Sequence, residues 1–145
     1  MTKIYFCGSI RGGRQLASVY KTIISMLQAH GKVLTEHLGD DQEIERKDRV
    51  LSDVVIHDRD MQWIRESDLL VAEVTVASLG VGYEIGRAIE MGKPVLCLFN
   101  NISKSPLSAM IAGSEGIHMH YYTDPVELSD LFSEFISQSA GRRTS

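Results

Sequence analysis

The sequence has few cysteines, no long hydrophobic run and no excess of positive charge, and each absence excludes a class of protein. Cys7 and Cys97, the only cysteines, lie in apolar segments, which is typical of buried thiols in a reducing compartment rather than of a disulfide framework. No apolar stretch approaches the roughly 18 residues that cross a bilayer, and the stretch from Ile4 to Cys7 is too short for the core of a signal peptide. The net charge of −4 argues against binding to a nucleic-acid polymer or to an anionic membrane. We therefore expect an intracellular, cytoplasmic protein that is small enough to enter the nucleus passively.

Short apolar runs alternate with amphipathic segments along the chain. The runs predict five strands, at 3–7, 32–35, 69–74, 94–99 and 117–122. The amphipathic spacing predicts helices at 15–30, 50–67, 107–112 and 125–136, and another that follows residue 84 and ends near Gly92. This alternation predicts an α/β fold, with a doubly wound, Rossmann-like or flavodoxin-like parallel sheet of about five strands and helices on both faces. We expect one domain over 1–136 and a disordered, flexible tail over 137–145.

A glycine-rich loop, Gly8-Ser9-Ile10-Arg11-Gly12-Gly13-Arg14, follows the first predicted strand. Its backbone N–H groups are unobstructed, and the dipole of the following helix favours an anion there. The loop lacks the Gly-Lys-Ser/Thr ending of a Walker motif and the glycine spacing of a dinucleotide fingerprint. It predicts a phosphate cradle, and the alternative is a tight turn with solvated arginines.

A second candidate loop follows the third predicted strand. Ser78 and Gly80 can bind an anion at the start of a helix, and Glu84 lies about one turn later. A second carboxylate, Asp60, lies late in the preceding predicted helix. Paired carboxylates are typical of enzymes that cleave glycosidic bonds. The alternatives are a capping role for Glu84 and a solvated position for Asp60.

Five sequence blocks carry a family resemblance. They are YFCGSIRGGR at 5–14, LTEH at 34–37, VAEVT at 71–75, SLGVGYEIGRA at 78–88 and LSAMI at 107–111. These blocks resemble the 2′-deoxynucleoside 5′-phosphate N-hydrolases, a branch of the nucleoside 2-deoxyribosyltransferase superfamily. The resemblance implies hydrolysis of the N-glycosidic bond of deoxynucleoside monophosphates to a free base and 2-deoxyribose 5-phosphate, without cofactor or metal.

The resemblance also implies roles for individual residues. Glu84 is expected to be the nucleophile, Asp60 to assist departure of the base, and Tyr5 to orient the nucleophile or the sugar. A homodimer is expected in which Ser108 reaches the neighbouring subunit's site. The expected substrate-binding residues are Gly8, Ser9, Ile10, Arg11, Gly12, Gly13, Arg14, Ser78, Gly80, Ser108, Ala109 and Met110.

Two other functions compete with hydrolysis. A nucleoside 2-deoxyribosyltransferase would pass the same sugar to a second base, although such an enzyme needs no phosphate site. A nucleotide-sensing module would bind a monophosphate without turnover. Glu36 and His37 are candidate base contacts, whereas the segments 39–47 and 100–105 fall outside the matching blocks, so the preferred base is not predicted. His118 and His120 share one face of a predicted strand, and packing or solvent exposure is favoured there over metal binding.

Overall fold

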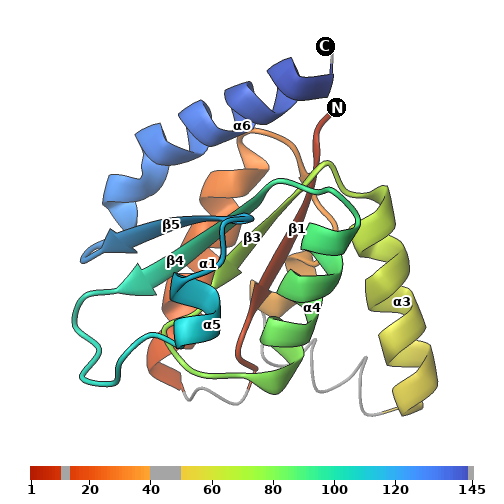
Figure 1. Ribbon diagram of the computed structural model, residues 1–145, viewed down its shortest axis with the longest axis horizontal. Helices are drawn as coiled ribbons and strands as arrows, with labels where there is room; N and C mark the ends of the chain where they lie inside the picture. Colours follow the sequence, from red (N-terminus) through yellow and green to blue (C-terminus); the bar gives the residue numbers. More distant parts are fainter. Residues whose placement is uncertain (11–13, 40–49, 144–145) are drawn as a thin grey trace.

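The computed structural model describes residues 1–10, 14–39 and 50–143, and the chain forms a parallel sheet between two layers of helices (Figure 1). The strand order is β2-β1-β3-β4-β5, and every neighbouring pair is parallel. The strands are β1 (Lys3–Gly8), β2 (Lys32–Val33), β3 (Leu69–Glu73), β4 (Val95–Asn100) and β5 (Ile117–Tyr122). This order is the flavodoxin-like doubly wound topology, which confirms the predicted fold class.

Five α-helices occur in the described part of the chain. They are α1 (Arg14–Gln28), α3 (Asp53–Glu66), α4 (Leu79–Glu90), α5 (Ala109–Ala112) and α6 (Ser129–Arg143). Two short 3-10 helices, η1 (Glu36–Gly39) and η2 (Pro125–Leu128), complete the connections. α1 and α6 pack on one face of the sheet, and α3 and α4 pack on the other (Figure 1).

The central strand β3 shows why both faces must be covered. All five of its residues are buried, as expected for a parallel strand with a helical layer on each side. Leu69 and Val71 belong to the core on the α1 and α6 face, and Leu70 and Ala72 belong to the core on the α3 and α4 face. Because side chains alternate along a strand, Glu73 is directed to the α1 and α6 face.

The chain runs from β1 outward to β2 and then returns across β1 to β3. The strand order therefore reverses between β1 and β3. In open parallel sheets, ligands bind beyond the carboxyl ends of the strands at such a reversal point. The fold thus directs attention to the segments that follow Gly8 and Glu73.

The two cysteines are free and buried, and the register of the sheet explains why they form no disulfide. Cys7 pairs with Ala72 on β3, and Ala72 pairs in turn with Cys97 on β4. Two strand spacings amount to roughly 9.5 Å. A disulfide requires Cα atoms within about 7 Å. The prediction of buried, unpaired thiols is confirmed.

The second strand is shorter than predicted, because a side chain replaces the backbone ladder at its end. Thr35 Oγ1 accepts a hydrogen bond from Phe6 N at 3.0 Å and donates one to Phe6 O at 2.6 Å. This exchange satisfies β1 without extending β2 past Val33. Similarly, α3 begins at Asp53 rather than at residue 50, because the hydroxyl of Ser52 caps it by accepting from Val55 N at 3.3 Å.

The prediction of a disordered tail from residue 137 is wrong as far as Arg143. Helix α6 continues to that residue without a break. Ser139 is buried, and its hydroxyl donates to Phe135 O at 2.9 Å, so a serine that suggested disorder is instead packed within the helix. Among the described residues, no helix is long and apolar enough to cross a membrane.

Candidate active site

A small cavity of about 40 Å³ lies at the point where the strand order reverses. Tyr5 comes from β1, Asp60 from α3 and Glu84 from α4, so the three predicted catalytic residues line one cavity although they lie far apart in sequence. The remaining wall is formed by Cys7, Gly8, Ile10, Thr35, His37, Leu38 and Arg59.

Glu84 takes its position from the way that α4 begins. Ser78 is the N-cap residue, and its hydroxyl accepts a hydrogen bond from Val81 N at 3.3 Å. A capping glutamate would occupy the position of Val81, three residues after the cap. Glu84 lies a further turn into the helix, so the capping alternative for this residue is wrong.

The environment of Glu84 favours its neutral form. Burial, followed by the negative charge of Asp60, raises the pKa of Glu84 from its ordinary 4.5 to about 7. The Tyr5 hydroxyl, the Cys7 thiol and the charge of Arg59 oppose this shift only in part. Within the described structure, the buried Oε2 atom of Glu84 has no hydrogen-bond partner. A buried carboxylate oxygen without a donor retains its lone pairs for a reacting atom.

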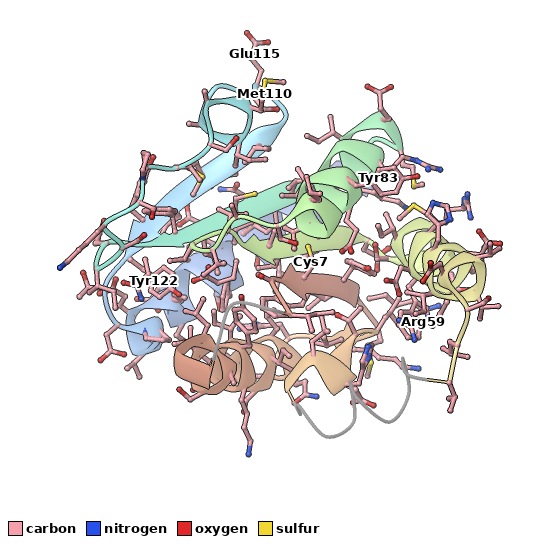
Figure 2. All side chains as sticks on the ribbon, turned by 90° about the horizontal axis from the view of Figure 1, so that it is seen from below. Cys7, Arg59, Tyr83, Met110, Glu115 and Tyr122 are labelled. Carbon is pink, nitrogen blue, oxygen red and sulfur yellow. The ribbon has the colours of Figure 1, made fainter. Side chains whose placement is uncertain are left out.

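The two neighbours of Glu84 on β1 are neutral side chains. Burial, with the charge of Glu84 next, raises the pKa of Tyr5 far above its ordinary value and does the same for the Cys7 thiol. A hydroxyl and a thiol that keep their protons act toward a carboxylate as donors, not as competing nucleophiles. Figure 2 shows Cys7 on the side of β1 that faces α4.

Asp60 is held by an arginine that sequence reasoning missed. Arg59 Nε donates to Asp60 Oδ1 at 3.0 Å, and Arg59 Nη2 lies 2.9 Å from the same oxygen. The Arg59 guanidinium also stacks on the Trp63 ring, 4.8 Å from its centroid. Arg59 and Trp63 are four residues apart, which is about one helical turn. This spacing is the sequence signal that could have revealed the contact between Arg59 and Trp63.

Of the two candidate base contacts, the structure brings only His37 to the cavity. His37 is buried, and its ring centroid lies 5.7 Å from that of Trp63. Glu36 is exposed and does not line the cavity. The imidazole of His37 therefore belongs to the wall of the cavity that also contains Glu84 and Asp60.

The predicted phosphate residues divide between two cavities. Gly8 and Ile10 line the small cavity, and Ser9 is buried beside them. Ser78, Ser108 and Met110 line a larger cavity of about 820 Å³, whose wall includes the first turn of α4. Gly80 and Ala109 are adjacent in sequence to that wall but are not part of it. Arg11, Gly12 and Gly13 lie outside the described residues, and of Arg14 the structure describes only the start of α1.

The model of the nucleoside 2-deoxyribosyltransferase family matches residues 4–129. This chain belongs to that family. It is 56% identical over 111 residues to the 5-hydroxymethyl-dUMP N-hydrolase of Danio rerio, which covers 77% of this chain and 78% of the relative. It is 49% identical over 138 residues to the protein of the same name from Tetraodon nigroviridis, covering 90% of this chain and 97% of the relative. The CMP N-glycosidase of Clostridium botulinum shares the fold, with a TM-score of 0.62 at 18% identity over 91% of this chain and 99% of that chain.

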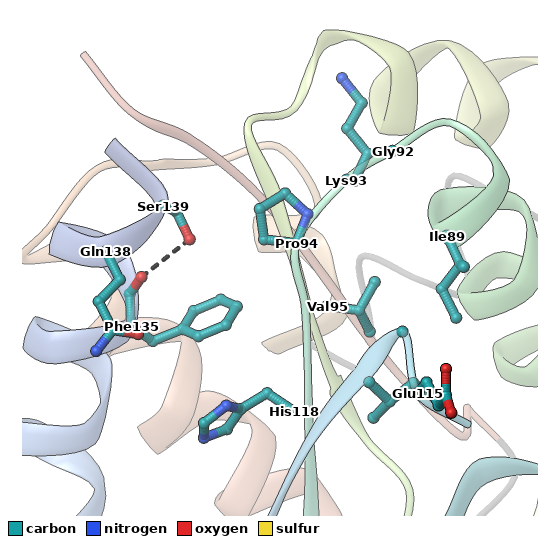
Figure 3. A pocket seen from close by; sticks show the side chains of 12 residues that line it. Ile89, Gly92, Lys93, Pro94, Val95, Glu115, His118, Phe135, Gln138 and Ser139 are labelled. Carbon is teal, nitrogen blue, oxygen red and sulfur yellow. Dashed lines mark hydrogen bonds between the residues drawn. The ribbon is translucent and has the colours of Figure 1, made fainter. Parts of the chain in front are cut away.

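A third cavity, of about 370 Å³, lies at the amino ends of β4 and β5, away from the carboxyl ends where the small cavity lies (Figure 3). Its wall includes Val95 and Ile117, the first residues of β4 and β5. The amine of Lys93 is engaged by the carbonyl oxygens of Arg65 and Ser67 at 2.9 and 2.8 Å, and none of the predicted site residues that the structure describes lines this cavity. It therefore lacks the paired carboxylates of the small cavity.

The described residues include no group of three or more His, Cys, Asp or Glu side chains that could hold a metal ion. His118 instead packs near Phe135 of α6, with ring centroids 5.9 Å apart.

Proposed function

We propose that this chain hydrolyses the N-glycosidic bond of 2′-deoxynucleoside 5′-monophosphates and releases a free base and 2-deoxyribose 5-phosphate. The observation that carries the proposal is the pair of carboxylates, Glu84 and Asp60, in the wall of one cavity, with Oε2 of Glu84 lacking a partner among the described residues. The relatives named as 5-hydroxymethyl-dUMP N-hydrolases support the substrate class. The chain is an N-glycosidic bond hydrolase of deoxynucleotides.

The reaction proceeds in two displacements at the anomeric carbon. Glu84 attacks C1′ as the C1′–N bond breaks, and the base departs with the electron pair of that bond while Asp60 assists its departure. Water then attacks C1′ and releases Glu84, and the proton that water loses ends on the base. Tyr5 and Cys7 orient the Glu84 carboxylate, since both interact with it as neutral donors.

The 5′-phosphate supplies binding energy remote from the bond that breaks. We assign it to the backbone and side chains of the glycine-rich loop, including Ser9 and Arg11, together with Ser78 and Gly80. A 2′-hydroxyl withdraws electrons from the positive charge that develops on the sugar, so deoxynucleotides are the easier substrates. His37, buried in the same cavity, is assigned to the base.

A second copy of the chain completes the site. Leu79, Ile102 and Met110 line the larger cavity and are 97%, 73% and 83% exposed in the single chain. Figure 2 shows Met110 directed away from the body of the protein on α5. Apolar side chains gathered at such exposure favour a surface covered by a partner, and Ser108 lies within it. Sedimentation tests this proposal, which a fully active monomer would contradict.

The direct test is chromatographic measurement of free base. The substrates are 5-hydroxymethyl-dUMP, the common deoxynucleoside monophosphates, their unphosphorylated forms and the ribonucleotides. Glu84→Gln is the test variant, and Glu90→Gln, an exposed glutamate of the same helix, is the matched control. We expect the unaltered chain to release base from deoxynucleoside monophosphates and from none of the other substrates. Glu84→Gln should lose this activity, and Glu90→Gln should keep it.

Two other results would replace the proposal. The family's name favours a transferase as the second candidate. A new nucleotide formed on addition of a free acceptor base, together with release from unphosphorylated deoxynucleosides, would establish that transferase activity. Tight binding of a monophosphate by the unaltered chain, with no base released, would establish a nucleotide-sensing module.

A further inference from the structure

The strand that leads to Ser78 ends in a buried glutamate, Glu73, which the proposed reaction does not use. Glu73 is 0% exposed and lies on the face of the sheet opposite to that of the Glu84 cavity. Its Oε1 accepts a hydrogen bond from Thr75 N at 2.7 Å, and its Oε2 accepts from the Thr75 hydroxyl at 2.9 Å. The hydroxyl of Tyr122 donates to the same Oε2. Both carboxylate oxygens therefore have partners.

These hydrogen bonds fix the start of the turn that ends at Ser78. Thr75 is held through its N–H and its hydroxyl, and its Oγ1 also accepts from Asn100 N at 2.9 Å. Asn100 and Tyr122 are the last residues of β4 and β5, so Glu73 joins the carboxyl ends of three strands. The direction in which the chain leaves Thr75 determines where Ser78 and the first turn of α4 lie.

The Glu73 carboxylate also lies close to Tyr20, the residue that packs against Gly8 at the start of the glycine-rich loop. Burial and the nearby charge of Glu73 raise the pKa of Tyr20 on α1. The Tyr20 ring closely covers Gly8, because a Cβ at Gly8 would lie only 2.7 Å from Tyr20 Cζ. Gly8 is also the register partner of Glu73 in the sheet, so Glu73 lies close to the first residue of each loop that we assign to the phosphate.

We propose that Glu73 is a positioning residue for the substrate's phosphate, acting through Thr75 on the turn that presents Ser78. This inference rests on the proposed function, because it takes Ser78 as a phosphate ligand. A carboxylate suits this position because it is an acceptor at every lone pair and meets three donors. A glutamine would present an NH₂ group to at least one of these donors.

The test compares Glu73→Gln with Asp68→Asn. Asp68 Oδ2 accepts a hydrogen bond from Lys3 N at 2.8 Å at the other end of β3, so each variant neutralises a carboxylate that holds a backbone N–H at an end of that strand. In Glu73→Gln we expect the KM for the deoxynucleoside monophosphate and the inhibition constant of inorganic phosphate both to rise about tenfold, the scale of one lost hydrogen bond to a charged group. The kcat should stay within about threefold of the unaltered value, and Asp68→Asn should change neither binding constant.

Three results would overturn the positioning role. The first is a fall in kcat with an unchanged KM, and the second is an equal effect in Asp68→Asn, which would indicate general damage to the sheet. The third is a lower KM in Glu73→Gln, which would show that the carboxylate chiefly repels the phosphate.

A measurement without turnover separates this inference from the proposed function. If the unaltered chain releases no base from any substrate, the proposed function fails, and amide hydrogen exchange over residues 75–79 then decides the role of Glu73. Faster exchange in Glu73→Gln, with protection by inorganic phosphate only in the unaltered chain, supports the positioning role. Equal exchange and equal protection in both proteins would overturn it.

Discussion

Glu73 and Glu84 lie near the carboxyl ends of the strands, one on each face of the sheet. Glu73 is fully buried, and Glu84 is half-buried with a buried Oε2 atom. Burial raises the pKa of both above the ordinary value. Glu73 meets donors at both oxygens, whereas within the described residues the Oε2 atom of Glu84 meets none. A buried carboxylate whose hydrogen bonds are complete fixes the backbone around it, and one whose hydrogen bonds are incomplete retains reactivity. The comparison supports the positioning role that we propose for Glu73 and the catalytic role that we propose for Glu84.

The largest expected effect comes from replacing Glu84. In Glu84→Gln the rate of base release should fall by at least about a thousandfold, because an amide is a poor nucleophile and no neighbouring group replaces it. The KM should change little, since the cavity keeps its shape. Steady-state kinetics of Glu84→Gln and Glu73→Gln, measured side by side, test whether kcat falls only in the first. A similar loss of kcat in both variants would contradict the difference between the two glutamates.

The second effect concerns the pH dependence of the reaction. In the proposed reaction only the ionised form of Glu84 attacks. Because the pKa of Glu84 is raised to about 7, kcat/KM should fall as the pH decreases below about 7. The Tyr5 hydroxyl lowers the pKa of Glu84, so Tyr5→Phe should move this acidic limb to higher pH and reduce the rate about tenfold at neutral pH. An acidic limb at the same pH in Tyr5→Phe and in the unaltered chain would show that the Tyr5 hydroxyl does not lower the pKa of Glu84.

A third effect is on the stability of the fold, which should decrease as the pH rises, whereas kcat/KM should increase. The folded chain raises the pKa of Glu84 from 4.5 to about 7, so ionisation of Glu84 lowers the stability of the fold as the pH rises through that interval. Glutamine does not ionise. The Tm of Glu84→Gln relative to the unaltered chain should therefore increase between about pH 4.5 and 7 and stay constant above, as thermal unfolding followed by circular dichroism can show. A Tm difference independent of pH would contradict the burial of this charge.

The smallest effect is expected at Cys7. Its thiol lowers the pKa of Glu84 after the Tyr5 hydroxyl in order of strength. Cys7→Ala should therefore shift the acidic limb of kcat/KM in the same direction as Tyr5→Phe, but by less. Cys97→Ala is the matched control, because Cys97 is a buried thiol that lies two strands from Cys7 and does not line the cavity of Glu84. Equal shifts in the two cysteine variants would argue against a specific contact.

Much of the fold followed from local patterns in the sequence. The alternation of apolar runs and amphipathic segments predicted the parallel sheet, because each strand covered on both faces must be apolar throughout. The end of β2 and the length of α6 could not be predicted, because they depend on tertiary contacts. Thr35 bonds to Phe6 across the sheet, and Ser139 is buried within α6.

The candidate site was predictable in part. Tyr5, Asp60 and Glu84 were identified by motif, and the fold brings them to one cavity. Arg59 was missed because its contact with Asp60 depends on how α3 faces the cavity, although the spacing to Trp63 was visible. Glu73 was visible as the charged end of an apolar strand followed by a threonine, but its partner Tyr122 lies 49 residues away.

The most direct test of the central role assigned to Glu84 is to look for the covalent intermediate. The unaltered chain would be mixed with 5-hydroxymethyl-dUMP, quenched in acid within its first turnover, digested and analysed by mass spectrometry. The account predicts a 2-deoxyribosyl 5-phosphate group on the peptide that contains Glu84, and none on that peptide from Glu84→Gln. An adduct on the peptide that contains Asp60, or rapid base release with no adduct at any time, would contradict it.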